Sequence, residues 1–363
     1  MRAFVITGPG RAEVQEVEPP EPGAGEVVVE VERAGVCGTD MEFYSGAMSY
    51  LHTGEARYPV RIGHEWAGTV REVGDGVDPA WLGRRVTGDT MLGCGRCARC
   101  GAGRQHLCAD RYEIGVRRGW PGALAERLPV PVRALQPLPA SVDARLGALV
   151  EPGGNALRAV RAAALSPGER LLVIGPGTIG LLAALVAEAQ GVEVHLLGLT
   201  EGSLAFARSL GFSRTWTAPG VPPDGPPDGP PDGPRVGPPG GPPVLPPFGG
   251  LFDAVIDAST GPGSPALAVE AVEPGRRVVF IGLSADPSRA DTRRLVLKDV
   301  TAVGVLSASG GLAGTTELYA SGRVDPRPLV AATVPLEEAA AVLAGRRRPE
   351  WGGAPKVHID PRT

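Results

Sequence analysis

Apolar and polar positions along this chain predict strands in its first part and a strand-helix repeat further on. The first fourteen residues, MRAFVITGPGRAEV, alternate like a strand, and residues 26–34 (EVVVEVERA) and 58–62 (YPVRI) are also strand-like. Residues 169–199 contain an apolar strand, a glycine-rich turn, a long apolar helix and a second strand. Further apolar strands follow at FDAVIDAS, RRVVFIG and TAVGVLS, separated by helical stretches. This alternation predicts an α/β region with a parallel, doubly wound sheet.

A run of proline and glycine from 219 to 250 interrupts this pattern, and three PPDG repeats lie within it at 222–234. Proline lacks the amide donor that helices and sheets need, and glycine is entropically costly to fix, so the run is expected to be extended or disordered. A third strand is expected at SRTWTA, before the run, and FDAVIDAS follows the run. The run is therefore predicted to replace the helix that would ordinarily cross from the third strand to the fourth, and another segment must cover that sheet face.

The composition of the chain limits the classes of function and partner to be considered. The 363 residues suffice for two domains, and 43% hydrophobic content is typical of a globular protein. The net charge of -4 argues against nucleic acid or an anionic membrane as a partner, because both favour a basic surface. No signal peptide or transmembrane window is present in the sequence, so we expect a soluble, cytoplasmic protein that acts on small molecules.

Four of the five cysteines lie within fifteen residues, in the segment CGRCARCGAGRQHLC. The spacing of Cys94, Cys97, Cys100 and Cys108 suits a closed, tetrahedral zinc site, which is structural because no position is left for substrate. His106 is an alternative ligand, although four thiols make a packing or solvated role the simpler interpretation. A nucleic-acid-binding zinc ribbon is disfavoured by the acidic chain and by the single compact cluster.

The fifth cysteine forms part of a second candidate metal site. Cys37 and the adjacent pair His64 and Glu65 each follow strand-like segments and are flanked by glycines that mark turns. A thiolate, an imidazole and a carboxylate are the ligands of an open, catalytic zinc site. Taken singly, each residue has an ordinary structural interpretation. Glu151, just before Pro152 and an apolar helical run, can likewise be a helix-start carboxylate.

The turn after the first strand of the α/β region is GPGTIG, which closes a strand and opens a helix as dinucleotide-binding turns do. Gly175, Gly177 and Gly180 are assigned to the tight turn, the approach of the pyrophosphate and the helix-strand contact, and the phosphates are expected at the helix start, Thr178 and Ile179. The second strand ends at Gly198 and Thr200 with no carboxylate for the adenosine ribose. This favours NADP over NAD, although no arginine follows directly and Glu201 is close by.

Together these motifs resemble the zinc-dependent medium-chain dehydrogenases/reductases of the alcohol dehydrogenase superfamily, in the branch of sorbitol, threonine and glucose dehydrogenases. The resemblance rests on AGVCGTD, GHEWAG, the four-cysteine lobe, LVEP, GPGTIG and PKVHID. It implies a GroES-like β-barrel catalytic domain over 1–154, completed by 308–363, and a Rossmann domain over 155–307 that carries the insertion. The resemblance also implies a homodimer or homotetramer.

The resemblance assigns roles to individual residues. It implies a catalytic zinc at Cys37, His64 and Glu151, with Glu65 able to exchange with water or with Glu151. It makes Thr39 the hydroxyl that passes on the alcohol proton, and it places Lys356 on the pyrophosphate of the cofactor. The strand ends expected to line the cofactor groove are Ser259, Leu283 and Ser307.

Two departures from the family pattern stand out. Glu42 occupies a position where many relatives carry histidine, which alters the outer proton relay. Gly153, Gly154 and Asn155 follow the EP pair where apolar residues are common. Either the helix start is loose, or Asn155 faces the site, or Asn155 is a capping or turn residue.

The sequence therefore predicts a zinc-dependent oxidoreductase that transfers a hydride between NAD(P) and a secondary alcohol or the corresponding ketone, the alcohol being a sugar, polyol or cyclitol. Two alternatives remain open at this point. One is a catalytically silent NADPH-binding sensor or scaffold, and the other is a zinc-free reductase of activated double bonds.

Overall fold

The computed structural model describes residues 1–218, 243–288 and 290–363, so the PPDG repeat lies outside the described residues. The chain forms two compact units. The first contains Met1–Gly154 and Ser307–Thr363, and the second contains Asn155–Leu306. The second unit thus ends at Leu306, one residue before the boundary expected from the sequence. Within the described residues, no helix is both long enough and apolar enough to cross a membrane.

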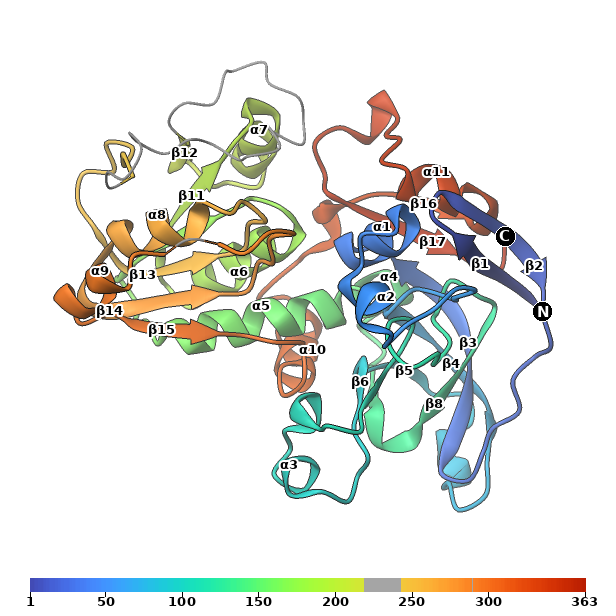
Figure 1. Ribbon diagram of the computed structural model, residues 1–363. Helices are drawn as coiled ribbons and strands as arrows, with labels where there is room; N and C mark the ends of the chain where they lie inside the picture. The colour runs from blue at the N-terminus through green and yellow to red at the C-terminus, as the bar shows by residue number, and fades with distance from the viewer. Residues whose placement is uncertain (219–242, 289) are drawn as a thin grey trace. The chain divides into compact units, whose positions relative to one another are not determined.

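The first unit is built on a seven-stranded sheet in which β3 is central (Figure 1). The strands along it are β16 (Val330–Pro335), β17 (Lys356–Asp360), β3 (Glu26–Gly35), β4 (Glu65–Val73), β5 (Arg85–Gly88) and β9 (Leu135–Pro137), and β8 (Arg127–Pro131) also pairs with β3. Valines at alternate positions of β3 join a buried core with Trp66 and Leu128. Val28, which points to the other face, is buried as well, so this part of β3 is covered on both sides.

Shorter elements complete the first unit. Its remaining strands are β1 (Arg2–Gly8) paired with β2 (Arg11–Glu16), and β6 (Met91–Leu92) paired with β7 (Tyr112–Glu113). Its helices are α1 (Gly38–Ser45), α2 (Ser49–Thr53), α3 (Ala98–Gly101), α4 (Ala144–Gly147), α10 (Leu312–Ala320) and α11 (Ala339–Leu343). Its 3-10 turns are η1 (Pro79–Trp81), η2 (Gln105–Leu107), η3 (Val132–Ala134), η4 (Arg327–Leu329), η5 (Leu336–Glu338) and η6 (Pro349–Trp351).

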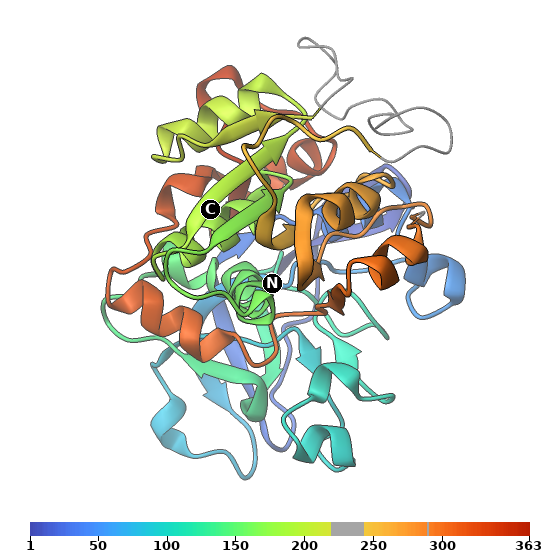
Figure 2. The ribbon, with the colours of Figure 1, turned by 90° about the vertical axis from the view of Figure 1, so that its left-hand side faces the viewer.

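The second unit has a six-stranded parallel sheet, which confirms the doubly wound Rossmann fold (Figure 2). The strand order is β12 (Thr215–Thr217), β11 (Glu193–Gly198), β10 (Arg170–Ile174), β13 (Phe252–Asp257), β14 (Val272–Phe280) and β15 (Thr301–Gly304). The sheet reverses its order between β10 and β13, where open sheets of this kind bind their ligands at the carboxyl ends of the strands.

The second unit also contains helices. They are α6 (Thr178–Glu188), α7 (Glu201–Ser209), α8 (Ser264–Ala271) and α9 (Thr292–Leu297), and α5 (Val150–Ala163) begins in the first unit and continues into the second. Helix α6 packs on β10 and β11, and α8 packs on β10, β13 and β14.

Residues 243–251, which include the end of the proline-glycine run, cover part of the sheet beside β12 and β13. Phe248 is buried against Trp216 of β12 and Phe252 of β13, with ring centroids 5.3 and 5.0 Å apart. Arg170 of β10 holds the segment by donating to the carbonyl oxygens of Phe248 (3.1 Å) and Leu251 (2.8 Å). The run falls between β12 and β13, as the sequence predicts, and this segment supplies cover for the sheet.

The glycines at the start of α5 allow close packing against α10, whose Tyr319 and Thr315 face them. A Cβ on Gly153 would lie 2.2 Å from the Tyr319 hydroxyl and 2.6 Å from a methyl group of Thr315. A Cβ on Gly154 would lie 2.9 Å from that of Ala308. The helix begins at Val150, ahead of both glycines, so the expectation of a loose helix start is wrong. The small residues are instead required by packing.

Candidate functional site

Cys37, His64 and Glu65 meet at one end of the β3–β4 pair. The two strands are antiparallel, and Gly35 at the end of β3 pairs with Glu65 at the start of β4. Cys37 follows the first strand and His64 precedes the second, so the register brings them to the same edge. A ligand atom from each of the three residues lies within 4.8 Å of the others. The structure therefore joins two sequence segments that were predicted to form one site.

Asp40 ties the two ligand segments together and was not assigned a role from the sequence. Its buried carboxylate accepts hydrogen bonds from the backbone amides of Cys37 (2.9 Å) and Gly63 (3.1 Å). It also lies 3.6 Å from Nδ1 of His64. Burial alone would lower the pKa of His64, but the charges of Asp40 and Cys37 outweigh it and raise that pKa well above its ordinary value. Asp40 therefore supplies negative charge beside both ligand segments.

Glu65 and Lys356 form a buried ion pair beside these ligands. The Lys356 ammonium lies 2.6 and 2.8 Å from the two Glu65 carboxylate oxygens and 2.9 Å from the Val36 carbonyl oxygen. Glu65 is 1% exposed and Lys356 is 2% exposed. Burial lowers the pKa of Lys356, but the charges of Glu65 and Cys37 more than offset this and leave the pKa raised, so the ammonium is charged.

Thr39 and Glu151 are the other two residues that the sequence analysis assigned to this site. Thr39 is half-buried in the first turn of α1, two residues after the N-cap Cys37. Glu151 is buried in the first turn of α5. Among the described residues, the group of ligands within 4.8 Å contains Glu65 and not Glu151.

The donor set fits a metal ion. A thiol, an imidazole and a carboxylate converge, and His64 and Glu65 are buried while Cys37 is half-buried. A bound cation is one way to satisfy such a cluster of buried polar groups. Zn²⁺ accepts this combination of sulfur, nitrogen and oxygen ligands.

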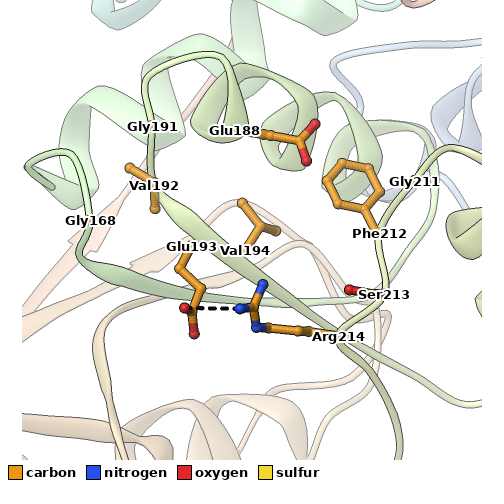
Figure 3. A pocket seen from close by; sticks show the side chains of 10 residues that line it. All are labelled: Gly168, Glu188, Gly191, Val192, Glu193, Val194, Gly211, Phe212, Ser213 and Arg214. Carbon is orange, nitrogen blue, oxygen red and sulfur yellow. Dashed lines mark ion pairs between the residues drawn. The ribbon is translucent and has the colours of Figure 1, made fainter.

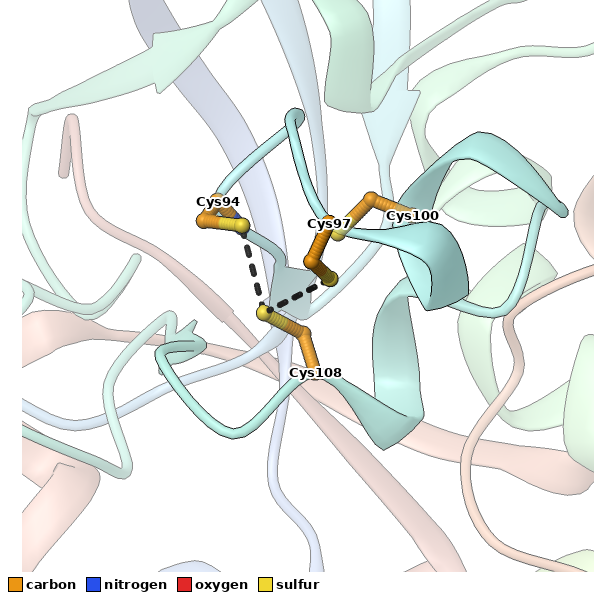
Figure 4. A group of neighbouring side chains, drawn as sticks. All are labelled: Cys94, Cys97, Cys100 and Cys108. Atoms are coloured by element: carbon orange, nitrogen blue, oxygen red, sulfur yellow. Dashed lines mark hydrogen bonds between the residues drawn. The ribbon is translucent and has the colours of Figure 1, made fainter.

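The four-cysteine lobe forms a second cluster, in which one sulfur atom from each cysteine lies within 4.8 Å of the others (Figure 4). The Sγ atoms of Cys97 and Cys108 are 3.8 Å apart, and the Cys94 amide lies 3.4 Å from Cys108 Sγ. His106 lies outside this four-sulfur group. Its side chain is buried in η2, so it is not solvated. Four converging sulfurs suit a closed, structural zinc site.

Backbone amides favour the thiolate form in this lobe. The amides of Arg96 and Cys97 lower the pKa of Cys94 to about 6, because they donate to its sulfur. Cys100 behaves oppositely, since burial raises its pKa to about 11. A metal ion bound in the lobe would favour the thiolate of Cys100, because coordination requires deprotonated sulfur.

The glycine-rich turn of the second unit has the geometry expected of a phosphate-binding loop. Gly175 has φ of 91°, a conformation that favours glycine. A Cβ on Gly180 would lie 2.0 Å from the Gly175 carbonyl oxygen, so the turn also needs glycine there. Gly177 is the N-cap of α6 and nothing lies within 4 Å of its Cβ position, while Thr178 and Ile179 form the helix start. The loop thus leaves backbone amides accessible to an anion.

At the end of β11 the polar groups already have partners. Thr200 caps α7 by accepting from the Ser203 amide at 3.3 Å, and its hydroxyl lies 3.0 Å from Ser203 Oγ. Glu201 is ion-paired with Arg208. A Cβ on Gly198 would approach side-chain atoms of Leu204 and Pro176 to 2.9 Å.

The other strand-end residues occupy different surroundings. Ser259 follows β13 and donates to the buried carboxylate of Asp257 at 2.8 Å, a partner that sequence reasoning missed. Leu283 follows β14 and is 77% exposed. Ser307 belongs to the first unit, is buried and has φ of 66°.

A hollow of about 300 Å³ in the second unit lies away from the glycine-rich turn (Figure 3). Its lining comes from the segments that enter the amino ends of β10, β11 and β12, whereas the turn lies at the carboxyl end of β10. Its charged groups include Glu193 and Arg214, which are 3.2 Å apart. The hollow is therefore at the wrong end of the sheet for a dinucleotide.

Comparisons with known proteins agree with this architecture. Residues 23–140 match the alcohol dehydrogenase GroES-like domain family. The chain is 35% identical over 309 residues to an L-threonine 3-dehydrogenase from Saccharopolyspora erythraea, covering 84% of this chain and 83% of that protein. It is 39% identical over 190 residues to a 2-dehydro-3-deoxy-L-galactonate 5-dehydrogenase from Pseudoalteromonas atlantica, covering 52% and 54% of the two chains.

Comparison with solved structures also finds dehydrogenases. The alcohol dehydrogenase of Thermus sp. ATN1 has a TM-score of 0.83 and 28% identity, covering 99% of both chains. A protein from Sinorhizobium meliloti 1021, described as a zinc-binding dehydrogenase bound to NADP, has a TM-score of 0.81 and 26% identity, also covering 99% of both chains. This chain belongs to the zinc-dependent medium-chain dehydrogenases of the alcohol dehydrogenase superfamily. Its first unit contains the GroES-like fold that the resemblance implied.

Proposed function

We propose that the protein is an NAD(P)-dependent dehydrogenase of secondary alcohols with a catalytic metal site at Cys37 and His64. The observation that carries this proposal is the convergence of Cys37, His64 and Glu65 at one edge of the β3–β4 pair. The family relatives, which are threonine, sugar-acid and alcohol dehydrogenases, support the reaction class.

A zinc ion held by Cys37, His64 and one acidic residue would act as a Lewis acid that lowers the pKa of an alcohol hydroxyl. Asp40 fixes the two ligand segments through its hydrogen bonds to the amides of Cys37 and Gly63. Thr39, in the first turn of α1, is the hydroxyl that we assign to moving the alcohol proton toward solvent. A dinucleotide held at the glycine-rich turn of Gly175, Gly177 and Gly180 would supply the nicotinamide as hydride acceptor.

The test of this proposal combines metal analysis with turnover. We expect two zinc ions per chain, one at Cys37 and His64 and one in the four-cysteine lobe, together with reduction of NADP or NAD by a panel of polyols, sugar acids and threonine. A metal content near zero would favour a zinc-free reductase. Tight NADPH binding and full zinc loading without turnover of any alcohol would favour a sensor or scaffold.

For the cofactor we propose a preference for NADP. No carboxylate ends β11, and the nearby Glu201 is paired with Arg208, so a 2′-phosphate meets little repulsion there. The N-terminus of α7 adds amide donors beside Thr200 and Ser203. Because Thr200 and Ser203 share a hydrogen bond, the phosphate contact is assigned to this helix start and not to Thr200 alone.

Replacing Gly198 by aspartate tests this preference. The added carboxylate would repel a 2′-phosphate and accept from a ribose hydroxyl, so we expect the ratio of kcat/KM for NADP to that for NAD to fall at least about tenfold, or about 1.4 kcal/mol. Gly198→Ala is the matched control, since it adds the same Cβ beside Leu204 and Pro176 without the charge. An unchanged ratio in Gly198→Asp would remove the basis for the NADP assignment.

For assembly we propose a homodimer or homotetramer. Strand β15 is an exposed edge without charge or proline, and the nearby Val296 and Leu297 are 79% and 76% exposed. Soluble monomers usually protect such an edge, so these features support pairing with a second copy. Light scattering coupled to size exclusion measures the assembly directly, and a monomer at micromolar concentration would contradict this part of the proposal.

A further inference from the structure

The ion pair between Glu65 and Lys356 bears on the metal site directly, because Glu65 is also one of the three converging ligand residues. Both of its carboxylate oxygens accept from the same ammonium, at 2.8 and 2.6 Å. Each oxygen engaged by the ammonium is a poorer donor to a cation. The structure thus shows Glu65 shared between a lysine and the place where the metal would bind.

Gly35 is what allows this ion pair to form. The two partners come from β4 and β17, which lie on opposite sides of β3 in the sheet. A Cβ on Gly35 would lie 2.2 Å from Glu65 Oε2, so the carboxylate occupies the space that any side chain at this position would fill. The missing side chain therefore gives the carboxylate room beside β3, where Lys356 reaches it.

The donors of Lys356 are fully used inside the first unit. An ammonium has three N–H groups, and three oxygen atoms lie within 2.9 Å of Nζ, namely the two of Glu65 and the Val36 carbonyl. With 2% exposure, the side chain has no donor left over for a phosphate in this arrangement. The pyrophosphate contact implied by the family resemblance would require it to release Glu65.

We propose that Lys356 is a positioning residue for the metal centre, which holds Glu65 beside Gly35 and so keeps a coordination position free for the substrate oxygen. This inference rests on the proposed function, because it requires a metal at Cys37 and His64. It implies that Glu65 enters the coordination sphere when the lysine is removed, since a buried carboxylate left without its cation is strongly unfavourable.

Lys356→Met tests the proposal through the rate at which zinc leaves the protein. The methionine keeps a similar length and volume but removes the charge, so Glu65 becomes an added ligand. We expect the release of the Cys37-site zinc to a colorimetric chelator to slow about tenfold or more, the range by which groups around a metal site alter its binding. The rate of substrate turnover should fall in the same variant. Cys37→Ser identifies this kinetic phase, because that variant retains only the zinc of the four-cysteine lobe.

Two further variants separate the proposed role from a general disturbance. The zinc-release rate of the double variant Glu65→Gln/Lys356→Met should lie within about threefold of the rate of Glu65→Gln alone. If Lys356 acts on the metal only through Glu65, its removal has little effect once the carboxylate is gone, which is what a double-mutant cycle measures. Gly35→Ala should slow release as Lys356→Met does, because it moves the carboxylate while leaving the lysine in place. It remains informative if Lys356→Met does not fold.

The possible failures can be told apart. If wild-type protein binds two zinc ions, but Lys356→Met or Gly35→Ala leaves the release rate unchanged or makes it faster, the positioning role is wrong. Weaker NADPH binding with unchanged zinc release would assign Lys356 to the cofactor instead. A wild-type protein with zinc only in the four-cysteine lobe would overturn the proposed function itself.

Discussion

Cys37→Ser is expected to reduce kcat/KM for every alcohol substrate by about a thousandfold or more, because the loss of Lewis-acid stabilisation is worth several kcal/mol. Cys37 supplies the single thiolate of the candidate catalytic site, and its position after β3 places it beside His64. A serine hydroxyl is a much weaker ligand for zinc than a thiolate. Steady-state kinetics together with zinc content measures the effect, and zinc should fall from two ions to one per chain.

The protein should stay folded in this variant. Cys37 is half-buried at a helix N-cap position, where serine is also well tolerated. The unfolding temperature of zinc-free Cys37→Ser should therefore remain close to that of zinc-free wild type. A fully active Cys37→Ser protein would refute the catalytic assignment.

Cys97→Ser is expected to act on stability before chemistry. The substitution removes one of four sulfurs that converge in the lobe, and a structural zinc contributes its binding free energy to folding. We expect a loss of about 3 kcal/mol, which lowers the unfolding temperature of a unit of this size by roughly 6–12 °C. Calorimetry of the zinc-loaded proteins is the measurement, read beside the zinc content of each.

Arg96→Ala is the matched control within the same lobe. Its side chain is exposed, and the contact that lowers the pKa of Cys94 comes from the Arg96 backbone amide, which alanine retains. This variant should unfold within about 2 °C of wild type, as exposed substitutions usually do. Equal unfolding temperatures for Cys97→Ser and wild type, both loaded with zinc, would show that the lobe does not depend on its fourth sulfur.

The sequence predicts those parts of the site that depend on local order. The turn at Gly175 and Gly180 could be read because a strand, a turn and a helix follow each other directly, and the structure shows why glycine is needed there. Cys37 follows β3, which its sequence pattern predicts, but the expected strand at 58–62 is wrong, because only an isolated bridge forms there at Val60 and the strand beside His64 is β4. In both cases the geometry follows from neighbouring residues or from one antiparallel pair.

The contacts that the sequence did not predict depend on distant strands. Lys356 and Glu65 are 291 residues apart, and they meet only because β17 and β4 both pair with β3. The need for glycine at 153 likewise arises from Tyr319 on another helix. Such requirements are set by packing, for which hydrophobic periodicity carries no signal.

The contact between Trp216 and Phe248 also provides an optical probe. Of the five tryptophans in the chain, only Trp216 falls within the second unit, and it stacks on His195 and contacts Phe248. If the other four are replaced by phenylalanine, the remaining indole fluorescence comes from the second unit alone. Detachment of Phe248 from the sheet would then be visible as a shift in emission, separately from any unfolding of the first unit.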